Sequence, residues 1–252
     1  MERKRQNVAV LVPARNEEEG LPRILPECVR QVGADSVLVV DDGSTDRTAE
    51  VAAGYGVCVL SLRPGRGKGG ALRAGFDRLL GEGRDAIVTL DGDGQHDPSS
   101  IPLFIAEASA SGADLVIGAR AGAVSLARRF ANWASAAFLS AALGHRVRDA
   151  QSGYRLYAAR LLREASLSGE GFAFETEILA YAAAGRGIAF VPIPLIAARR
   201  PSHIDPFRDV PAIVARHVTI AATARRARRA ARSRAARTDA GGRGGGPNEP
   251  AE

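Results

Sequence analysis

The sequence predicts an α/β protein in which helices cover both faces of a mostly parallel sheet. Two features lead to this prediction. Short apolar runs recur along the first half of the chain, and segments with helical periodicity separate them. An almost continuous apolar run is typical of a strand that is buried on both faces, as in a parallel sheet. The 252 residues are enough for one large domain of this kind.

The first half of the chain consists of strand–helix units. The predicted strands cover residues 8–12, 37–40, 57–62, 87–90 and 115–117. The helices after the first four strands are expected at 17–31, from Ser44 or Thr45 onward, at 71–80 and at 98–110. The first helix shows the pattern most clearly, because Leu21, Ile24, Leu25 and Cys28 fall on one face.

The second half of the chain has a less regular pattern. We expect one or two helices at 124–143, a strand at 153–157, a helix at 174–184, a strand at 188–193 and a helical segment at 206–237. The resulting division is one domain over residues 1–210, a C-terminal helix with an arginine-rich end over 211–237, and a disordered tail over 238–252. Glycine and proline dominate that tail, which has too few apolar residues to form a core.

The positive charge is concentrated near the C-terminus. The formal net charge is +6, and from Arg225 onward eight arginines face three carboxylates, which leaves about +1 for residues 1–224. On a helix such arginines favour an anionic membrane surface by about 1 kcal/mol each. Nucleic-acid binding ranks lower, because no aromatic residues for base stacking lie between the arginines. A merely solubilising extension is the third interpretation.

The composition favours a cytoplasmic protein. Cys28 and Cys58 form no CxxC pair, so neither a disulfide framework nor a cysteine-based zinc site is expected. No stretch of about 18 residues is both uncharged and apolar, and no signal-peptide pattern precedes the first strand. We therefore expect a cytoplasmic location, peripheral on the inner face of the cell membrane if the arginine-rich segment binds lipid.

Polar residues follow each of the first four predicted strands. They lie in the segments 13–17, 41–46, 63–69 and 91–97. In open α/β sheets ligands bind at the carboxyl ends of the strands, so this set predicts a ligand site. Taken singly, Ser44, Asp46 and Asp97 are best interpreted as capping or turn residues.

The segment Asp91-Gly92-Asp93 predicts a metal site. Two carboxylates at positions i and i+2, with the Gln95 amide nearby, supply the hard oxygen ligands that Mg²⁺ or Mn²⁺ prefers. A metal bound there can hold a diphosphate. An EF-hand loop is excluded, because its twelfth position would be Pro102 instead of glutamate.

A dinucleotide-binding site is a competing interpretation of the third strand–helix turn. Gly65, Gly67 and Gly70 match the GxGxxG pattern, and Asp91 follows about twenty residues later. That pattern normally occupies the first turn of its sheet, so we favour a basic loop in which Arg66 and Lys68 contact phosphates. A P-loop is excluded, because the chain has no GxxxxGK[ST] segment.

The same segments resemble the family 2 glycosyltransferases, and most closely the dolichol-phosphate or polyprenol-phosphate mannosyl- and glucosyltransferases. The strings that carry the resemblance are VAVLVPARNEEEGL, VLVVDDGSTDRTAEVA, GRGKGGALRAGF and IVTLDGDGQHDPSSIP. Shorter matches are DLVIGAR, RRFANW, DAQSGYRLY, FAFETEIL and VPIP. Together they span about residues 7–210, in order. The resemblance implies the GT-A fold and transfer with inversion at the anomeric carbon.

The resemblance also implies roles for individual residues. A nucleoside-diphosphate sugar donor would lie on Pro13, Arg15, Asn16, Glu17, Asp41 and Asp42. Asp91, Asp93 and Gln95 would hold Mg²⁺ or Mn²⁺ on the donor diphosphate, with Asp93 also counted among the catalytic residues. Arg120 and Arg129 would face the phosphate of a polyprenyl acceptor.

Two features depart from the pattern of such enzymes. In the stretch 199–204 that follows the VPIP strand, His203 stands where a lysine is common, and the usual glycine is not evident. We still expect Arg200 and His203 to contact the donor. The C-terminal transmembrane pair of many relatives is missing from this sequence.

Three alternatives remain beside transfer to a polyprenyl phosphate. A lipid phosphate is already an anion and needs no base, whereas a saccharide or small-molecule hydroxyl would need one, with Asp149, Glu175 and Glu177 as candidates. His96 and His145 are weaker candidates for that base. A basic-tailed binding protein on a transferase scaffold is disfavoured by the intact Asp91, Asp93 and Gln95. A sugar-phosphate nucleotidyltransferase would need an arginine-containing glycine-rich loop after the first strand, where this chain has PARNEEE.

Overall fold

A computed structural model of the chain describes residues 7–121, 140, 152–165, 172–183 and 187–194. Apart from residue 140, the predictions for 124–143 and 206–237, and the predicted tail at 238–252, lie outside these residues. The domain boundaries near residue 210 therefore stay predictions.

The described strands form one sheet in the order β3-β2-β1-β4-β6-β5-β7. Their bounds are β1 Val8–Ala14, β2 Val37–Asp41, β3 Cys58–Ser61, β4 Ala86–Thr89, β5 Leu115–Ala121, β6 Arg155–Ala158 and β7 Ile188–Pro194. All neighbouring pairs are parallel except those of β6, which runs antiparallel to both β4 and β5. The prediction of a mostly parallel sheet is confirmed.

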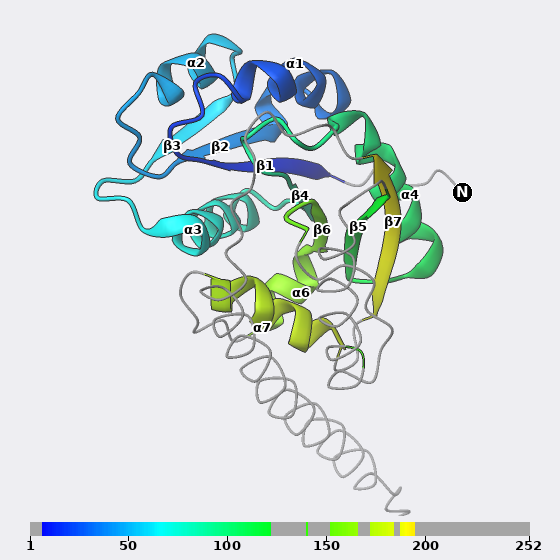
Figure 1. Ribbon diagram of the computed structural model, residues 1–252. Coiled ribbons are helices and arrows are strands. Elements are labelled where there is room, and N and C mark those ends of the chain that lie inside the picture. The colour runs from blue at the N-terminus through cyan, green and yellow to red at the C-terminus, as the bar shows by residue number, and fades with distance from the viewer. Residues whose placement is uncertain (1–6, 122–139, 141–151, 166–171, 184–186, 195–252) are drawn as a thin grey trace, which may run out of the picture.

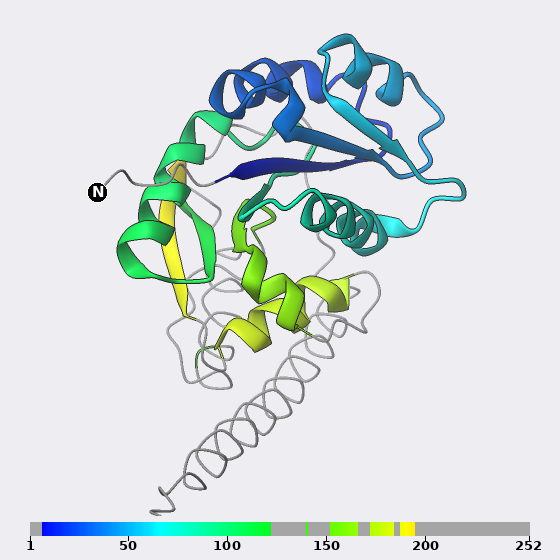
Figure 2. The ribbon, with the colours of Figure 1, turned by 180° about the vertical axis from the view of Figure 1, so that it is seen from behind.

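Helices cover both faces of this sheet (Figures 1 and 2). One face packs against α1 (Leu21–Val32), α2 (Thr48–Gly54) and α4 (Ile101–Ser111), and the other against α3 (Gly67–Gly81), α6 (Ala159–Glu164) and α7 (Phe172–Ala183). Short 3-10 turns η1 and η2 cover Ala34–Ser36 and Pro98–Ser100. In β1, Ala9 and Leu11 face the α3 side while Val8, Val10 and Val12 face the α1 side, which explains the continuous apolar run.

Three predicted helix starts were wrong, two of them because side chains at those positions bond within the loops. The third is that of α3, which begins at Gly67 instead of residue 71 and so includes part of the glycine-rich segment. Helix α2 begins at Thr48 instead of Ser44 or Thr45, whose polar groups bond to the loop after β1. Helix α1 begins at Leu21 and not at Glu17, whose backbone N–H donates to Thr48. The difference leaves two longer loops at the carboxyl edge of the sheet than the sequence predicted.

The strand predicted at 153–157 is β6, but its antiparallel direction and the helix α6 that follows it were not predicted. Strand β6 lies between β4 and β5, although it follows both in the chain. Its Leu156 faces the α1 side and Tyr157 the α3 side, so it is buried like the parallel strands. Burial alone does not reveal the direction of a strand, and this is why the pattern gave no sign of its orientation.

Candidate functional site

The loops after β1, β2, β3 and β4 meet at one edge of the sheet. Because these four strands are parallel neighbours, their carboxyl ends lie side by side. Two glycines show how closely the loops approach. A Cβ atom on Gly20 would lie 2.2 Å from the carbonyl oxygen of Gly92, and one on Gly65 would lie 2.5 Å from that of Asp42. The predicted convergence of the four segments is confirmed.

Asn16 joins the loop after β1 to the loop after β2. Its backbone has a φ of 55°, a left-handed conformation that asparagine tolerates better than most residues. Its N–H donates to Ser44 Oγ at 3.0 Å, and its Oδ1 accepts from the N–H of Thr45 at 2.8 Å. These reciprocal bonds hold the two loops in register with each other.

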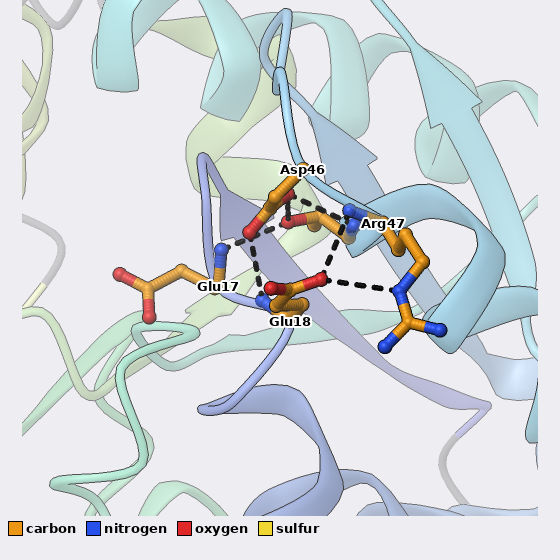
Figure 3. Close-up of polar contacts among 5 residues, drawn as sticks. Glu17, Glu18, Asp46 and Arg47 are labelled. Carbon is orange, nitrogen blue, oxygen red and sulfur yellow. Dashed lines mark hydrogen bonds and ion pairs between the residues drawn. The ribbon is translucent and has the colours of Figure 1, made fainter.

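Asp46 makes a second connection between the same two loops (Figure 3). Its carboxylate accepts the N–H of Glu18 at 3.2 Å and the N–H of Thr48 at 3.0 Å, as well as the Thr48 hydroxyl. Burial raises the pKa of Asp46, but its bonds to Thr48 and Glu18 outweigh burial and lower that pKa. Thr48 Oγ1 accepts from Glu17 at 2.8 Å, and Glu18 pairs with Arg47. The turn role expected of Asp46 is confirmed.

Asp41 and Asp42, at and just after the end of β2, also accept hydrogen bonds from backbone N–H groups. Both are buried, with 1% and 4% of their surface exposed. Asp41 Oδ1 accepts the N–H of Ser44 at 3.0 Å, and Asp42 Oδ1 accepts the N–H of Arg66 at 2.5 Å. Among the described residues, Asp41 Oδ2 has no hydrogen-bond partner. A buried carboxylate oxygen without a partner is costly, so this atom is suited to accept from a ligand.

Asp91 and Lys68 form an ion pair at the other end of the site. Lys68 lies in the first turn of α3, and its Nζ is 2.6 Å from Asp91 Oδ1. Burial raises the pKa of Asp91, but Lys68, His96 and Arg155 together hold the pKa of that carboxyl below its ordinary value. Burial lowers the pKa of Lys68, but Asp91 and Glu175 outweigh it and raise that pKa.

Asp93 and Gln95 contact each other in the loop after β4. Asp93 accepts the Gln95 N–H at 3.0 Å and its side-chain amide at 2.8 Å. The described residues contain no group of three or more His, Cys, Asp or Glu side chains placed to hold a metal. Two carboxylates and one amide nevertheless fit Mg²⁺ or Mn²⁺, which commonly take one or two protein carboxylates and complete their shells with phosphate and water.

His96 and Asp97 have structural roles. The imidazole is buried with 8% exposed, lies against Tyr154, and its Nδ1 accepts the N–H of Asp91 at 3.3 Å. Asp97 caps η2 by accepting the N–H of Ser99 at 2.9 Å. Because His96 is enclosed and its Nδ1 already accepts a hydrogen bond, it is poorly placed as a general base.

The glycines of the GxGxxG pattern are explained by the conformation and contacts of this segment, and Gly67 has a positive φ of 74°. Gly65 approaches the backbone of Asp42, as described above, and a Cβ on Gly70 would lie 2.4 Å from the Cβ of Arg66. Both glycines allow the loop after β3 to fold closely onto its neighbours. The pattern therefore needs no dinucleotide to account for it.

Arg155 was missed as a candidate by the sequence reasoning. Its guanidinium is buried in β6 with 1% exposed and donates to the carbonyl oxygens of Ser152 at 2.7 Å and Glu175 at 3.4 Å. Arg155 also acts electrostatically on both Asp91 and Lys68. A charged residue inside an apolar strand is a signal that could have identified it, because such a group must be partnered.

For several predicted site residues, the structure describes no side-chain contact at this site. Pro13 and Arg15 lie at the end of β1, where Arg15 is exposed, and Arg120 belongs to β5, for which only the backbone is described. The predicted residues outside the described ranges are Arg129, Asp149, His145, Arg200 and His203. No helix among the described residues is long and apolar enough to cross a membrane.

Comparison with known proteins agrees with this geometry. A family model described as glycosyl transferase family 2 matches residues 9–167. An undecaprenyl-phosphate mannosyltransferase of Micrococcus luteus is 35% identical over 204 aligned residues, which cover 75% of this chain and 83% of that protein. A polyprenol monophosphomannose synthase of Mycolicibacterium smegmatis is 31% identical over 209 residues, which cover 77% of this chain and 78% of that protein.

Solved structures show the same fold. A crystal structure of glucosyl-3-phosphoglycerate synthase from Mycobacterium tuberculosis, with Mn²⁺, UDP-glucose and glycerol 3-phosphate, has a TM-score of 0.67 and 25% identity. The match covers 87% of this chain and 80% of that chain. The expected GT-A fold is thereby confirmed. Since the family model spans well over half of the chain, this protein belongs to the family 2 glycosyltransferases.

Proposed function

We propose that this protein is an inverting, metal-dependent glycosyltransferase that moves a sugar from a nucleoside-diphosphate sugar to a polyprenyl phosphate. The observation that carries the donor half of the proposal is the meeting of four loops at one sheet edge, with buried carboxylates at one end and Asp91 and Asp93 at the other. The acceptor half rests on the relatives that are named for polyprenyl phosphates.

The nucleoside would bind over the loops after β1 and β2. The unpartnered Oδ2 of Asp41 supports this placement, because base and ribose both offer N–H or O–H donors. Pro13, Arg15, Asn16, Glu17 and Asp42 would border the bound nucleoside, as the family resemblance implies. The polar groups there are already fixed by hydrogen bonds, so little ordering would be needed when a donor binds.

The donor diphosphate would lie toward the loop after β4. Asp91, Asp93 and Gln95 would hold Mg²⁺ or Mn²⁺ there, and the metal would stabilise the negative charge that grows on the departing nucleoside diphosphate. The start of α3, with Arg66 and Lys68, adds positive charge on the same side. We further propose that Arg200 and His203 contact the donor, as the family resemblance implies.

The acceptor phosphate would be oriented by Arg120 and Arg129. A phosphate oxygen is an anion at neutral pH, so the attacking group needs positioning more than it needs a base. Two arginines can supply that positioning through charge-assisted hydrogen bonds. This assignment explains why no free histidine is required at the site.

A small-molecule acceptor is the second candidate function. It is favoured by the similarity to glucosyl-3-phosphoglycerate synthase, whose structure holds glycerol 3-phosphate. In that case a base would be required, and Glu175 is the candidate whose side chain is described. That side chain is buried and contributes to the charge environment of Lys68.

A donor screen tests the proposal. The full chain would be incubated with Mn²⁺ or Mg²⁺, a polyprenyl phosphate in detergent and a panel of GDP- and UDP-sugars, and sugar would be measured in the organic extract. Sugar entering that extract with one donor, and only with metal, is the expected result. Release of nucleoside diphosphate without lipid product would favour the second candidate, and no turnover of any donor would contradict both.

We also propose that the arginine-rich segment 225–237 gives the protein a peripheral contact with the inner face of the cell membrane. The support is its charge, seven arginines in 13 residues. Replacing these arginines with glutamine in the full chain is expected to reduce sedimentation with anionic vesicles and to leave that with neutral vesicles unchanged. Equal sedimentation of both proteins with anionic vesicles would contradict this contact.

A further inference from the structure

Lys68 occupies an oxygen that a metal would need. Its ammonium lies 2.6 Å from Asp91 Oδ1, and the two side chains are 33% and 30% exposed, so the pair faces the open edge of the site. A divalent cation bound to Asp91 would then sit next to an ammonium of the same sign. Like charges this close repel each other strongly, so the lysine and the metal compete for one carboxylate.

Asp91 itself has little freedom to move away from Lys68. Its backbone N–H donates to His96 Nδ1 at 3.3 Å, which fixes the start of the loop. Its carboxylate lies against the backbone of Gly153, where an added Cβ would come within 2.6 Å of Oδ2. Since the carboxylate is held on these sides, the flexible side chain that can leave the pair is the lysine.

A second carboxylate, that of Glu175, lies within electrostatic reach of Lys68. Glu175 lies on α7, which packs against α3, the helix that carries Lys68. The Glu175 side chain is buried, with 5% exposed. After Asp91, it is the carboxylate whose charge most strongly raises the pKa of Lys68. Arg155 fixes this part of α7 by donating to the Glu175 carbonyl oxygen.

We propose that Lys68 is a positioning residue that holds Asp91 in the metal-free protein and moves toward Glu175 when a divalent metal takes Asp91. The lysine neutralises Asp91 while the site is empty of metal, and Glu175 keeps the lysine charge compensated once the metal has arrived. Because the metal must displace Lys68, it binds more weakly than it would to Asp91 and Asp93 without the lysine. This inference rests on the metal assignment of the proposed function.

The lysine content of the chain allows a direct test in the unmodified protein. Lys4 and Lys68 are its only lysines. With lysine labelled at the ε-carbon by ¹³C, the full chain gives two ε-methylene signals, and Lys68→Met identifies the one from Lys68. Added Mg²⁺ is expected to shift the Lys68 signal and to leave the Lys4 signal in place. A Lys68 signal that stays fixed while Mg²⁺ displaces bound Mn²⁺ would overturn the inference.

Metal affinity gives the second readout. Free Mn²⁺ would be measured by electron paramagnetic resonance with the full chain and no donor. Lys68→Met is expected to bind Mn²⁺ about 10-fold more tightly than the wild type, the size of a typical coupling between two sites. Arg78→Met is the matched control, because it removes one positive charge from the far end of α3, where Arg78 pairs with Glu82. It should leave the Mn²⁺ affinity unchanged.

The role of Glu175 is tested in two backgrounds. Glu175→Gln is expected to weaken Mn²⁺ binding about 5-fold when Lys68 is present. In Lys68→Met the same substitution should have little effect, because Glu175 acts on metal binding only through its interaction with Lys68. Equal effects in both backgrounds would overturn the role of Glu175. Circular dichroism of each variant confirms that the comparison is between folded proteins.

The outcomes separate this inference from the metal assignment. Mn²⁺ binding by the wild type, with no gain in Lys68→Met, would overturn the inference and leave the assignment standing. No Mn²⁺ binding by the wild type, Lys68→Met or Arg78→Met would overturn the assignment and the inference with it. Binding that appears only in Lys68→Met would support both.

Discussion

The two ends of the candidate site are organised by different interactions. At the proposed nucleoside end, formed by the loops after β1 and β2, carboxylates and side-chain oxygens mainly accept backbone N–H groups, as Asp46 does from Glu18 and Thr48. At the proposed metal end, formed by the loop after β4 and the start of α3, the carboxylate of Asp91 is paired with the ammonium of Lys68. The first end is held mainly by hydrogen bonds to the backbone, and the second by an ion pair between two side chains.

This difference indicates how each end responds to a donor. Bonds from backbone N–H groups cost no side-chain entropy on the donor side. An ion pair between partly exposed side chains is weaker and is easily exchanged for a metal or phosphate. We therefore expect changes at the metal end to act on the reaction and changes at the nucleoside end to act first on stability.

The largest effect is expected for Asp91→Asn. The variant keeps the shape of the side chain and removes the charge that would hold the metal, so transfer should fall by at least about 100-fold, as for the loss of a principal electrostatic contact in an enzyme. Sugar transfer under the conditions of the donor screen measures it. The matched control is Asp77→Asn on the exposed face of α3, which should keep wild-type activity. Full activity of Asp91→Asn would remove the metal from the proposed mechanism.

Gly153→Ala is expected to act on the same carboxylate indirectly. The new Cβ would lie 2.6 Å from Asp91 Oδ2, so Asp91 must shift. A displacement of a catalytic group by a fraction of an ångström typically costs about 10-fold in rate, and we expect a loss of that order with a weaker Mn²⁺ affinity. Gly81→Ala is the control, because its added Cβ would lie within 4 Å of no atom beyond its chain neighbours and the backbone of its own helix. Unchanged transfer and Mn²⁺ affinity in Gly153→Ala would show that the position of Asp91 is not critical.

Two substitutions of Asn16 test the nucleoside end. Both Asn16→Gly and Asn16→Ala lose the bonds to Thr45, but alanine also has to adopt a φ of 55°. Asn16→Ala should therefore be less stable than Asn16→Gly by about 1 kcal/mol, the usual cost of a left-handed conformation. Urea unfolding followed by circular dichroism measures the difference. Equal stability of the two variants would mean that the loop has relaxed out of this conformation.

Acid should abolish the contribution of Asp91 to stability. Burial raises the pKa of Asp91, but Lys68 and the other charged neighbours lower it by more. The folded-state pKa of Asp91 therefore lies below the ordinary value of 3.8. A carboxyl of this kind stabilises the fold at pH values above its unfolded pKa, and the contribution is lost as the pH falls through the folded value. The difference in unfolding free energy between wild type and Asp91→Asn should therefore shrink below about pH 4. A constant difference down to pH 2 would contradict the lowered pKa.

Much of the site was visible in the sequence because it follows from local order. Apolar runs marked β1 to β4, and parallel strands bring their carboxyl ends to one edge, so Asn16, Asp42, Lys68 and Asp91 had to lie near one another. The residues at which the helices begin could not be predicted from such local patterns. Thr45 and Glu17 favour helix ends by type, but in the folded protein they bond across two loops, and such a choice depends on a neighbour far away in the chain.

The sequence by itself determined the α/β class, the family resemblance and the set of polar residues at the sheet edge. The reason is that periodicity and short motifs are local properties of the chain. Only the tertiary structure decided that β6 runs antiparallel between β4 and β5, that Arg155 is buried beneath the site, and that Lys68 pairs with Asp91. These features depend on which distant residues meet, and packing and charge compensation across the whole domain select those meetings.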